Sequence, residues 1–256
     1  MNPIKNDIEE TTKTIRQLRV KRLTEAQRYG PLVQRKLDAL DFAFNRFGVV
    51  AFADLGAAYR VDGGYSFYAL DTSPATRAII VDTHPTERLF TDAAVREGVE
   101  IVRGNFGDPA VIEKVGEVDA VVVFDVLLHQ VAPDWDEVRG LYAPKTRVFV
   151  IHNPQWLGPE TVRLLDLGKE KFLALVPKIR NEAVYRAAID RPDEVLPERG
   201  RRNRDVHHIW QWGITTTDLV LRMLSLGFAL RYFQDHGYFG GSENFRNQSF
   251  VFEKGA

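Results

Sequence analysis

The sequence predicts an α/β protein built on a doubly wound, mostly parallel open sheet with helices on both faces. Two observations carry this prediction: continuous apolar runs of six to eight residues recur along the chain, and segments with helical periodicity separate them. Such a run suits a strand that is buried on both faces of a parallel sheet. Strand, helix and strand in repeated succession imply right-handed crossovers. With 256 residues and 45% hydrophobic content, the chain can bury one large core or two small ones.

The N-terminal part of the chain reads as helical. Apolar residues recur at helical spacing from Ile15 to Phe47, and Gly30-Pro31 interrupts the run. This pattern predicts two or three helices before the first strand. We therefore expect a helical segment over residues 1–48, followed by the core domain over 49–256.

The first strands follow the helical segment at regular intervals. Their predicted ranges are 49–56, 77–82, 99–104, 118–125 and 146–151. The alternation stops after Asn153-Pro154, where residues 158–198 look largely helical and a polar stretch rich in Pro and Gly follows. A crossover needs far fewer residues than this. We interpret 154–213 as an insertion that caps the carboxyl edge of the sheet.

The alternation of helix and strand resumes near the C-terminus. Residues 215–228 predict a helix that Thr215 or Thr216 can cap and that Gly227 can end. Residues 230–239 and 248–254 then predict a closing pair of strands. The prediction is therefore a sheet of seven strands.

Composition limits the classes of partner and site. Lys and Arg number 34 against 35 Asp and Glu, so the chain lacks the positive field that drives general binding to nucleic acid or anionic membrane. The absence of cysteine excludes disulfides, thiolate metal sites and cysteine nucleophiles. Without a signal-like or membrane-spanning apolar stretch, we expect a cytoplasmic protein with a small-molecule substrate and no membrane partner. The charge balance disfavours nucleic acid as a partner, although a tRNA-type acceptor stays open. Assembly into a homo-oligomer stays open.

Two acidic residues mark the ends of the first two predicted strands. Asp54 is followed by Leu55-Gly56-Ala57-Ala58, and small residues there let a ligand approach the backbone. Asp82 ends the second strand, where a carboxylate can accept hydrogen bonds from both ribose hydroxyls and would repel a 2′-phosphate, which disfavours NADP. A tight turn without ligand and an ordinary loop aspartate are the alternatives.

The order of these motifs resembles that of a known family. FADLGAA, IIVDTHP, VRGNFGD and VVVFDVLLH, with LGF and a final SFVFEK, are similar to the class I S-adenosylmethionine (SAM)-dependent methyltransferases over about residues 49–153 and 213–254. The resemblance implies a Rossmann-like methyltransferase fold, SAM as cofactor and methyl transfer as the activity. The chain departs from the pattern at Gly56-Ala57-Ala58, where the family has a glycine-rich G-x-G, and in the longer spacing from Asp54 to Asp82.

The resemblance also implies which residues hold the cofactor. The methionine moiety would face Asp54, Gly56 and Ala58, and the ribose would bind Asp82. The remaining positions follow the third and fourth strands, where Asn105 and Phe106 would cover the adenine and the methyl donor would be lined by Phe124, Asp125 and Val126.

Two histidines are candidate catalytic bases. Methyl transfer is an in-line displacement, and an alcohol or phenol acceptor loses a proton that a histidine near neutral pH can take. His129 lies four residues after Asp125 and is the first candidate, and His152 closes the fifth strand at the same edge. A helix-capping role for His129 and an ordinary loop at His152 are the alternatives. These positions favour O-methylation.

The insertion supplies most of the candidate substrate-binding residues. An arginine-rich stretch at 199–204 could hold an anionic group, and tryptophan can stack on a sugar or an aromatic ring. The predicted substrate-binding residues are Trp156, Arg202, His207, His208, Trp210 and Trp212. Packing of the insertion and a solvated loop are the alternatives. We expect no metal here, since adjacent histidines on a strand point to opposite faces.

Together these patterns favour a SAM-dependent methyltransferase that acts on a small-molecule or sugar-containing metabolite, with the N-terminal helices and the insertion enclosing the acceptor. An NAD-dependent oxidoreductase on the same type of sheet is one alternative, although the chain lacks G-x-G-x-x-G. A non-catalytic domain that keeps the fold is the other, suggested by the alanines after Gly56.

Overall fold

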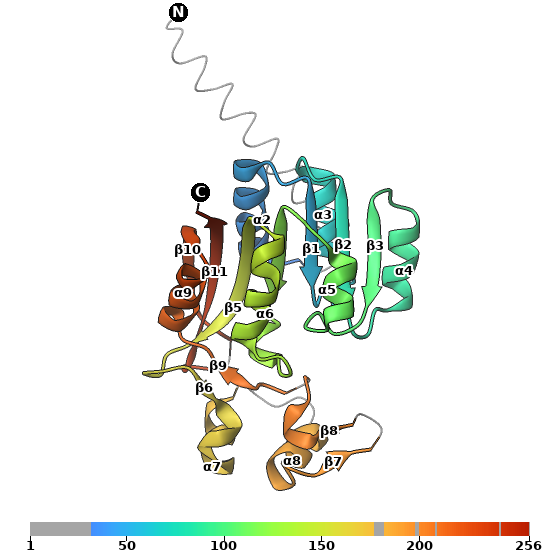
Figure 1. The fold of residues 1–256 in the computed structure, drawn as a ribbon. Helices are drawn as coiled ribbons and strands as arrows, with labels where there is room; N and C mark the ends of the chain where they lie inside the picture. Colours follow the sequence, from blue (N-terminus) through green and yellow to red (C-terminus); the bar gives the residue numbers. More distant parts are fainter. Residues whose placement is uncertain (1–31, 177–181, 198–199, 208, 241, 256) are drawn as a thin grey trace, which may run out of the picture.

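A computed structural model of the chain describes residues 32–176, 182–197, 200–207, 209–240 and 242–255 (Figure 1). The helices predicted before residue 32 lie outside this part of the chain. In the part that is described, no helix combines the length and the apolar character that crossing a membrane requires.

The core is a sheet of seven strands in the order β10-β11-β5-β4-β1-β2-β3. The first five strands along the chain run parallel, while β11 pairs antiparallel with both β5 and β10. The strands are β1 (Ala51–Leu55), β2 (Arg77–Asp82), β3 (Val99–Arg103), β4 (Ala120–Phe124), β5 (Val148–Trp156), β10 (Phe228–Tyr238) and β11 (Phe245–Lys254). The predicted mostly parallel sheet is confirmed, and every predicted strand overlaps an observed one.

Helices cover both faces of this sheet. One face carries α2 (Gln34–Phe47), α3 (Gly64–Thr72) and α4 (Glu87–Ala94). The other face carries α5 (Pro109–Val115), α6 (Trp135–Tyr142) and α9 (Thr216–Ser225). One-turn 3₁₀ helices occupy Leu127–His129, Ala143–Lys145, Leu164–Leu167 and Asn203–Asp205.

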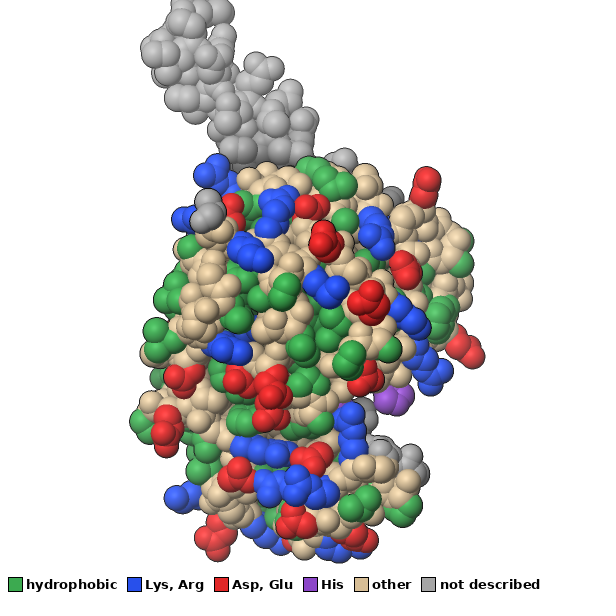
Figure 2. Space-filling view, in the orientation of Figure 1, with side chains coloured by type: hydrophobic (Ala, Val, Ile, Leu, Met, Phe, Trp, Pro, Cys, Tyr) green, Lys and Arg blue, Asp and Glu red, His purple; other side chains and the backbone are tan. Residues whose placement is uncertain are grey.

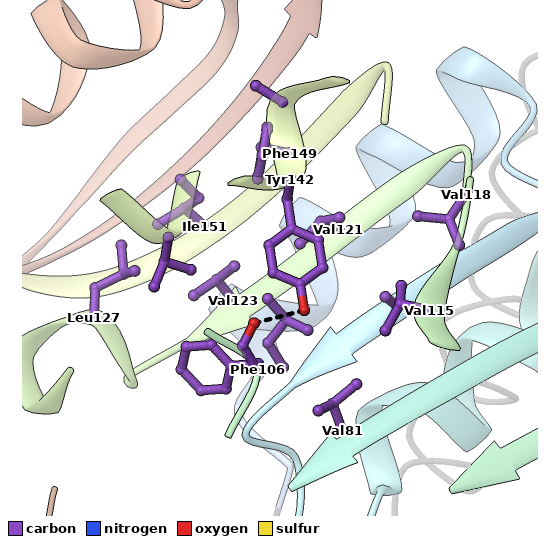
Figure 3. Packing of buried hydrophobic residues seen from close by; sticks show 14 of the residues in the cluster. Val81, Phe106, Val115, Val118, Val121, Val123, Leu127, Tyr142, Phe149 and Ile151 are labelled. Carbon is purple, nitrogen blue, oxygen red and sulfur yellow. Dashed lines mark hydrogen bonds between the residues drawn. The ribbon is translucent and has the colours of Figure 1, made fainter. Parts of the chain in front are cut away.

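Each face has its own hydrophobic cluster. On the α5/α6 face, apolar side chains of the central strands pack against both helices (Figure 3). The buried hydroxyl of Tyr142 in this cluster donates a hydrogen bond to the Phe106 carbonyl at 2.8 Å. This bond holds the loop after β3 against α6, so the packing of one face also positions a loop at the carboxyl edge of the sheet.

Helix α2 packs directly on the sheet. It buries Leu37, Leu40 and Phe44, which recur at helical spacing, and it ends at Gly48 in the left-handed region. These side chains join the cluster of the α3 face. The described part of the predicted N-terminal segment therefore covers the sheet, and the start of α2 lies near the carboxyl ends of the strands.

Helix α9 has the predicted capping residues at both of its ends. The Thr215 hydroxyl accepts from the Asp218 amide at 3.1 Å, as an N-cap does, and Gly227 adopts φ +84° after the last turn. The helix thus begins and ends where capping chemistry indicated.

The predicted insertion lies beyond the carboxyl ends of the parallel strands (Figure 1). It contains the helices α7 (Lys169–Leu175) and α8 (Glu182–Asp190) and two short antiparallel strand pairs. The pairs are β6 (Val162–Arg163) with β9 (Trp212–Gly213), and β7 (Val195–Leu196) with β8 (Arg201–Arg202). Within 158–198, which was expected to be largely helical, α7 and α8 are helices, whereas β6 and β7 are two-residue strands that carry too little periodicity to be seen in sequence.

Candidate active site

The chain reverses its path through the sheet between β1 and β4. From β1 it proceeds outward to β2 and β3, then returns to β4 on the other side of β1. In open α/β sheets, ligands bind in the crevice at this reversal, beyond the carboxyl ends of the strands. The predicted cofactor residues lie at the ends of these strands.

Asp54 is the residue before the last one of β1 and is 3% exposed. Ser66 of α3 donates a hydrogen bond to its carboxyl oxygen at 2.7 Å. Burial raises the pKa of this carboxyl to about 6, against the lowering effects of the Ser66 hydrogen bond and the Lys36 ammonium. The protonation state of this carboxyl therefore changes near pH 6, whereas an exposed aspartate is already ionised at that pH.

Gly56 forms the turn that follows Asp54. Its φ of +79° favours glycine, and a Cβ at this position would lie 2.4 Å from Cγ1 of Val126. The turn after β1 and Val126, the second residue after β4, thus approach so closely that no side chain fits between them. Gly56 and Val126, which were both predicted to face the cofactor, are therefore neighbours, and their contact with a cofactor stays a prediction.

Asp82 is held at the end of β2 by backbone donors from two turns. The Ala58 amide donates to one carboxylate oxygen at 2.9 Å, and the His84 amide donates to the other at 2.8 Å. A carboxylate oxygen has two lone pairs, so each can still accept a further hydrogen bond. Two hydroxyls on neighbouring carbons, as in a ribose, match this arrangement.

The two residues predicted to cover adenine are partly engaged by the protein. The Asn105 amide donates to the Ala132 carbonyl at 3.1 Å and its oxygen accepts from the Gly107 amide at 3.0 Å. The Phe106 side chain belongs to the cluster of the α5/α6 face (Figure 3). Asn105 therefore joins the loops after β3 and β4, and contact with adenine stays a prediction for both residues.

A lysine from α2 reaches the end of β4. Lys36 Nζ lies 2.5 Å from Asp125 Oδ2 and above the rings of Tyr65 and Phe124, at 5.2 and 5.4 Å from their centroids. Burial pushes the pKa of Asp125 upward, but the Lys36 ammonium and His152 hold it below its ordinary value. Asp125 is thus an ionised carboxylate paired with a largely buried cation.

His152 lies beside this ion pair and is fully buried. Its Nε2 is 3.9 Å from Asp125 Oδ1, and its Nδ1 is 2.8 Å from the Ser249 hydroxyl, which also lies 2.9 Å from His236 Nε2. Burial lowers the pKa of His152 to about 3, although Asp125 opposes the shift. The ring is therefore neutral at pH 7.

His129 is oriented by the insertion. It lies in the 3₁₀ turn after β4, and its Nδ1 is 2.7 Å from the Ile209 carbonyl oxygen. A carbonyl only accepts, so Nδ1 carries the hydrogen and Nε2 carries the lone pair. The Trp210 ring packs edge-on at 6.1 Å. This is the tautomer that a base acting through Nε2 requires.

The predicted tryptophans meet within the insertion rather than along one open face. Trp156 and Trp210 both pack against Phe245, with centroids 5.1 and 4.9 Å from it. The Trp212 indole donates to the Gln130 carbonyl at 2.8 Å. These contacts join the insertion to the edge of the sheet, and substrate stacking by these rings stays a prediction.

Among the predicted basic residues of the insertion, Arg202 has acidic partners. Arg202 pairs with Asp205 at 2.9 Å and with Asp193 at 3.6 Å. Figure 2 shows acidic and basic side chains side by side over the lower part of this face. His207 Nε2 lies 2.7 Å from an Arg201 nitrogen, and His208 lies outside the described residues. Arg202 is thus placed in surface ion pairs, and a role in binding substrate is untested.

Sequence reasoning missed the residues that come from distant parts of the chain. Lys36 is 89 positions from Asp125, and Ser249 is 97 positions from His152. For Ser249, a correct prediction of how β11 aligns with β5 would have identified the contact, because Ser249 pairs directly with His152 across these two strands. Across the described residues, no group of three or more His, Asp or Glu side chains has the arrangement of a metal site.

Comparison with known proteins finds similarity in structure only. No protein-family model matches the chain, and no curated protein sequence matches it. Among solved structures, an O-methyltransferase family protein from Burkholderia thailandensis aligns with TM-score 0.52 at 14% identity, covering 87% of this chain. This chain spans 56% of the length of that protein.

Two further solved structures align over most of both chains. The N-terminal domain of EvdMO1, solved in the presence of S-adenosylhomocysteine (SAH) and D-fucose, has TM-score 0.55 at 14% identity, covering 88% of this chain and 85% of that one. The 1,6-didemethyltoxoflavin-N1-methyltransferase of B. thailandensis, with its substrate and SAH bound, has TM-score 0.55 at 13% identity, covering 86% and 78%. The chain therefore has the fold of the class I SAM-dependent methyltransferases.

Proposed function

We propose that the protein is a SAM-dependent methyltransferase that acts on a small molecule. The observation that carries the proposal is the pair of acids at the reversal of the sheet: Asp54 ends β1 in a buried setting, and Asp82 ends β2 with both oxygens oriented by backbone amides. Structural neighbours with this fold have been solved with SAH, which supports SAM as the cofactor.

The residues present fit this cofactor. Asp82 would accept from the ribose hydroxyls, and Asp54 would pair with the ammonium of the methionine moiety. A Cβ at Gly56 would collide with Val126, so this position requires glycine. The turn after β1 therefore has no side chain at Gly56 that would keep a ligand away from its backbone. When bound, the cofactor supplies a methyl group on a positively charged sulfur. The residues of this chain align the acceptor with that methyl group and exclude water.

We infer that the acceptor atom is oxygen and that His129 takes its proton. The Ile209 carbonyl holds the ring in the tautomer whose Nε2 accepts a proton. His152 is less suited to this role, because burial lowers its pKa to about 3 and a protonated ring would be strongly disfavoured there. The insertion, which supplies Ile209, would close over the acceptor.

The first test is calorimetric titration of the full chain with SAM, SAH and NAD. We expect both adenosyl compounds to bind and NAD not to bind. Asp82→Ala should weaken SAH binding at least tenfold, because two ribose hydrogen bonds are lost. Asp92→Asn is the matched control, since Asp92 is on α4 and pairs only with Arg88 among the contacts of the described residues. Binding of NAD alone would reject the proposal, and failure of all three would favour a non-catalytic domain.

The second test concerns His129. SAH formation is measured against a panel of alcohols, phenols and amines, and the best acceptor is then used with two variants. His129→Ala should lower turnover about 100-fold or more while SAH affinity stays within twofold. His129→Asn keeps an N–H donor for the Ile209 carbonyl but has no group that takes a proton, so it should be equally slow. Unchanged turnover in both variants would exclude His129 as the base.

A further inference from the structure

A lysine ammonium lies among groups that bind cations at the carboxyl ends of β1 and β4. Lys36 Nζ, from the first turn of α2, is 2.5 Å from Asp125 Oδ2. The rings of Tyr65 and Phe124 lie 5.2 and 5.4 Å from this nitrogen and pack edge to face against each other. Lys36 also lowers the pKa of Asp54, so its charge acts on both carboxyls. Aromatic faces beside carboxylates are the groups with which proteins bind alkylammonium ligands.

This cation site is open to solvent on the side of Asp125. The Asp125 side chain is 40% exposed, whereas the Lys36 side chain that fills the site is 10% exposed. Asp125 also adopts φ +57°, a left-handed conformation that is uncommon for residues other than glycine and that clusters at functional sites. A ligand would therefore meet Asp125 first and would reach the two rings once the Lys36 ammonium withdraws.

Lys36 can leave the cation site without a change in the fold. Helix α2 is anchored to the sheet by other side chains, namely Leu37, Leu40 and Phe44. The Val33 amide before the helix donates to the Tyr65 hydroxyl at 3.0 Å, a contact that does not involve the ammonium. The lysine stem is flexible and has four carbons, so rotation of one side chain is enough to empty the site.

The charges around the cation site are balanced with Lys36 in place. The side chains whose charges act on Asp54 or Asp125 are Lys36, Arg35, Asp82 and His152. Burial keeps His152 neutral, and Asp82 accepts from the backbone amides of the neighbouring turns. Asp54 and Asp125 are therefore balanced by Lys36 and Arg35, and a further cation is favoured only where it replaces one of these two.

The proposed cofactor brings such a cation. Its methionine moiety carries an ammonium that would pair with Asp54, the carboxyl whose pKa Lys36 already lowers. Two ammonium groups cannot both lie against the same carboxylate and the same two rings, because like charges at contact distance repel each other. Lys36 and the ammonium of the cofactor therefore exclude each other from this site.

We propose that Lys36 is an internal competitor of the cofactor: its ammonium occupies the site that the cofactor's ammonium takes, and it withdraws when the cofactor binds. This inference rests on the proposed function. It gives the start of α2 a regulatory role, because the apparent affinity for the cofactor falls with the fraction of chains in which Lys36 fills the site.

The affinities for SAH and methylthioadenosine test this competition, since SAH carries the ammonium and methylthioadenosine lacks it. Titrations are made at pH 8, where the Asp54 carboxyl, with its pKa of about 6, is ionised. Lys36→Met removes the charge and keeps most of the apolar stem. It should tighten SAH binding at least tenfold and leave the affinity for methylthioadenosine within twofold.

The matched control is Lys114→Met, at an exposed side chain in the last turn of α5, which should change neither affinity. Weaker SAH binding in Lys36→Met would show that Lys36 stays in place and holds the carboxylate of the cofactor. Unchanged SAH binding would show that Lys36 does not compete. Either result would overturn the inference.

The parent chain gives a second readout that does not depend on a variant. Because Lys36 Nζ lies over two rings, ring currents should shift the NMR resonances of the adjacent methylene protons away from those of an exposed lysine. Saturating SAH should return these resonances to exposed values, and methylthioadenosine should not. If they stay shifted with SAH bound, the inference is wrong while the proposed function stands.

A separate ammonium tests the cation site without the cofactor. Lys36→Ala leaves room for n-butylammonium, which at about 50 mM should raise the midpoint of thermal unfolding of this variant by a few degrees. Neither n-butanol with the variant nor n-butylammonium with the parent chain should have this effect. If SAH binds neither the parent chain nor Lys36→Met, the proposed function fails. Stabilisation by n-butylammonium would then still support a cation site that Lys36 fills, and its absence would reject that site as well.

Discussion

The carboxyl of Asp54 opposes folding when it ionises. Its pKa is raised from 3.8 to about 6 in the folded chain, so ionisation near neutral pH costs about 3 kcal/mol. Between these two values the folded chain binds more protons than the unfolded chain, and this group destabilises the fold as pH rises through that window. A cation that pairs with the carboxylate would recover part of the cost. A buried, perturbed carboxyl in a crevice is typical of a functional site.

This balance predicts a pH dependence of cofactor binding. At pH 5 about nine-tenths of Asp54 is protonated and cannot pair with the ammonium of SAH, so affinity should fall about tenfold between pH 7.5 and pH 5. Binding at pH 5 should release close to one proton. Calorimetry in buffers of different ionisation enthalpy measures both quantities.

Two controls isolate the contribution of Asp54 to this profile. Methylthioadenosine lacks the ammonium and should bind with little pH dependence over the same range. Asp54→Asn keeps an acceptor for the Ser66 hydroxyl, which now donates at 2.7 Å, and should flatten the SAH profile. If the variant shows the same tenfold change as the parent, Asp54 does not contact the ammonium.

At the scale of the element, local sequence signals predicted the central strands well. The strand β2 occupies the predicted range 77–82. A short, continuous apolar run flanked by polar residues is typical of a buried strand in an α/β protein. Helix α9 was predicted from its caps for a similar reason: Thr215 and Gly227 act on the backbone next to them. Signals that operate within a few residues can be read without knowing the fold.

The insertion and the polar part of the site depend on contacts that sequence does not show. The pair β7 and β8 has two residues in each strand, too few for any periodicity. Strand β5 runs on to Trp156, beyond its predicted end at 151, because β11 pairs with it along its whole length. Lys36 was not recognised because its role depends on how α2 lies across the ends of the strands.

The candidate site residues show the same contrast between positions that the sequence predicts and properties that depend on distant contacts. Asp54 and Asp82, which we propose bind the cofactor, lie at the carboxyl ends of β1 and β2, so strand prediction alone brings them to one edge of the sheet. His152 was predicted there as well, but its neutrality comes from burial and its hydrogen bond from Ser249 on β11. Its chemistry therefore could not be predicted from its place in the sequence.

At the scale of the whole molecule, two regions have separate hydrophobic cores. The sheet is covered by clusters on both faces, while the insertion has a third cluster around Phe172, Tyr185 and Ile209. The insertion joins the sheet through a limited set of contacts, among them Phe245 and the turn after β4. Small cores with few connections open more easily than large ones.

We therefore predict that the insertion opens without unfolding of the sheet. In native-state hydrogen exchange, amides of α8 should exchange with an opening free energy several kcal/mol below that of β1 and β4. Tyr185→Phe provides the sharper test, because the buried Tyr185 hydroxyl accepts from the Trp210 amide at 3.1 Å. Loss of that acceptor should lower the opening free energy of the insertion by about 1–3 kcal/mol and leave the sheet unchanged. Tyr59→Phe, at a side chain 76% exposed, should affect neither region. Equal loss of protection in α8 and β4 would show instead that the insertion and the sheet unfold as one unit, and the insertion would then have to admit the acceptor without opening as a separate body.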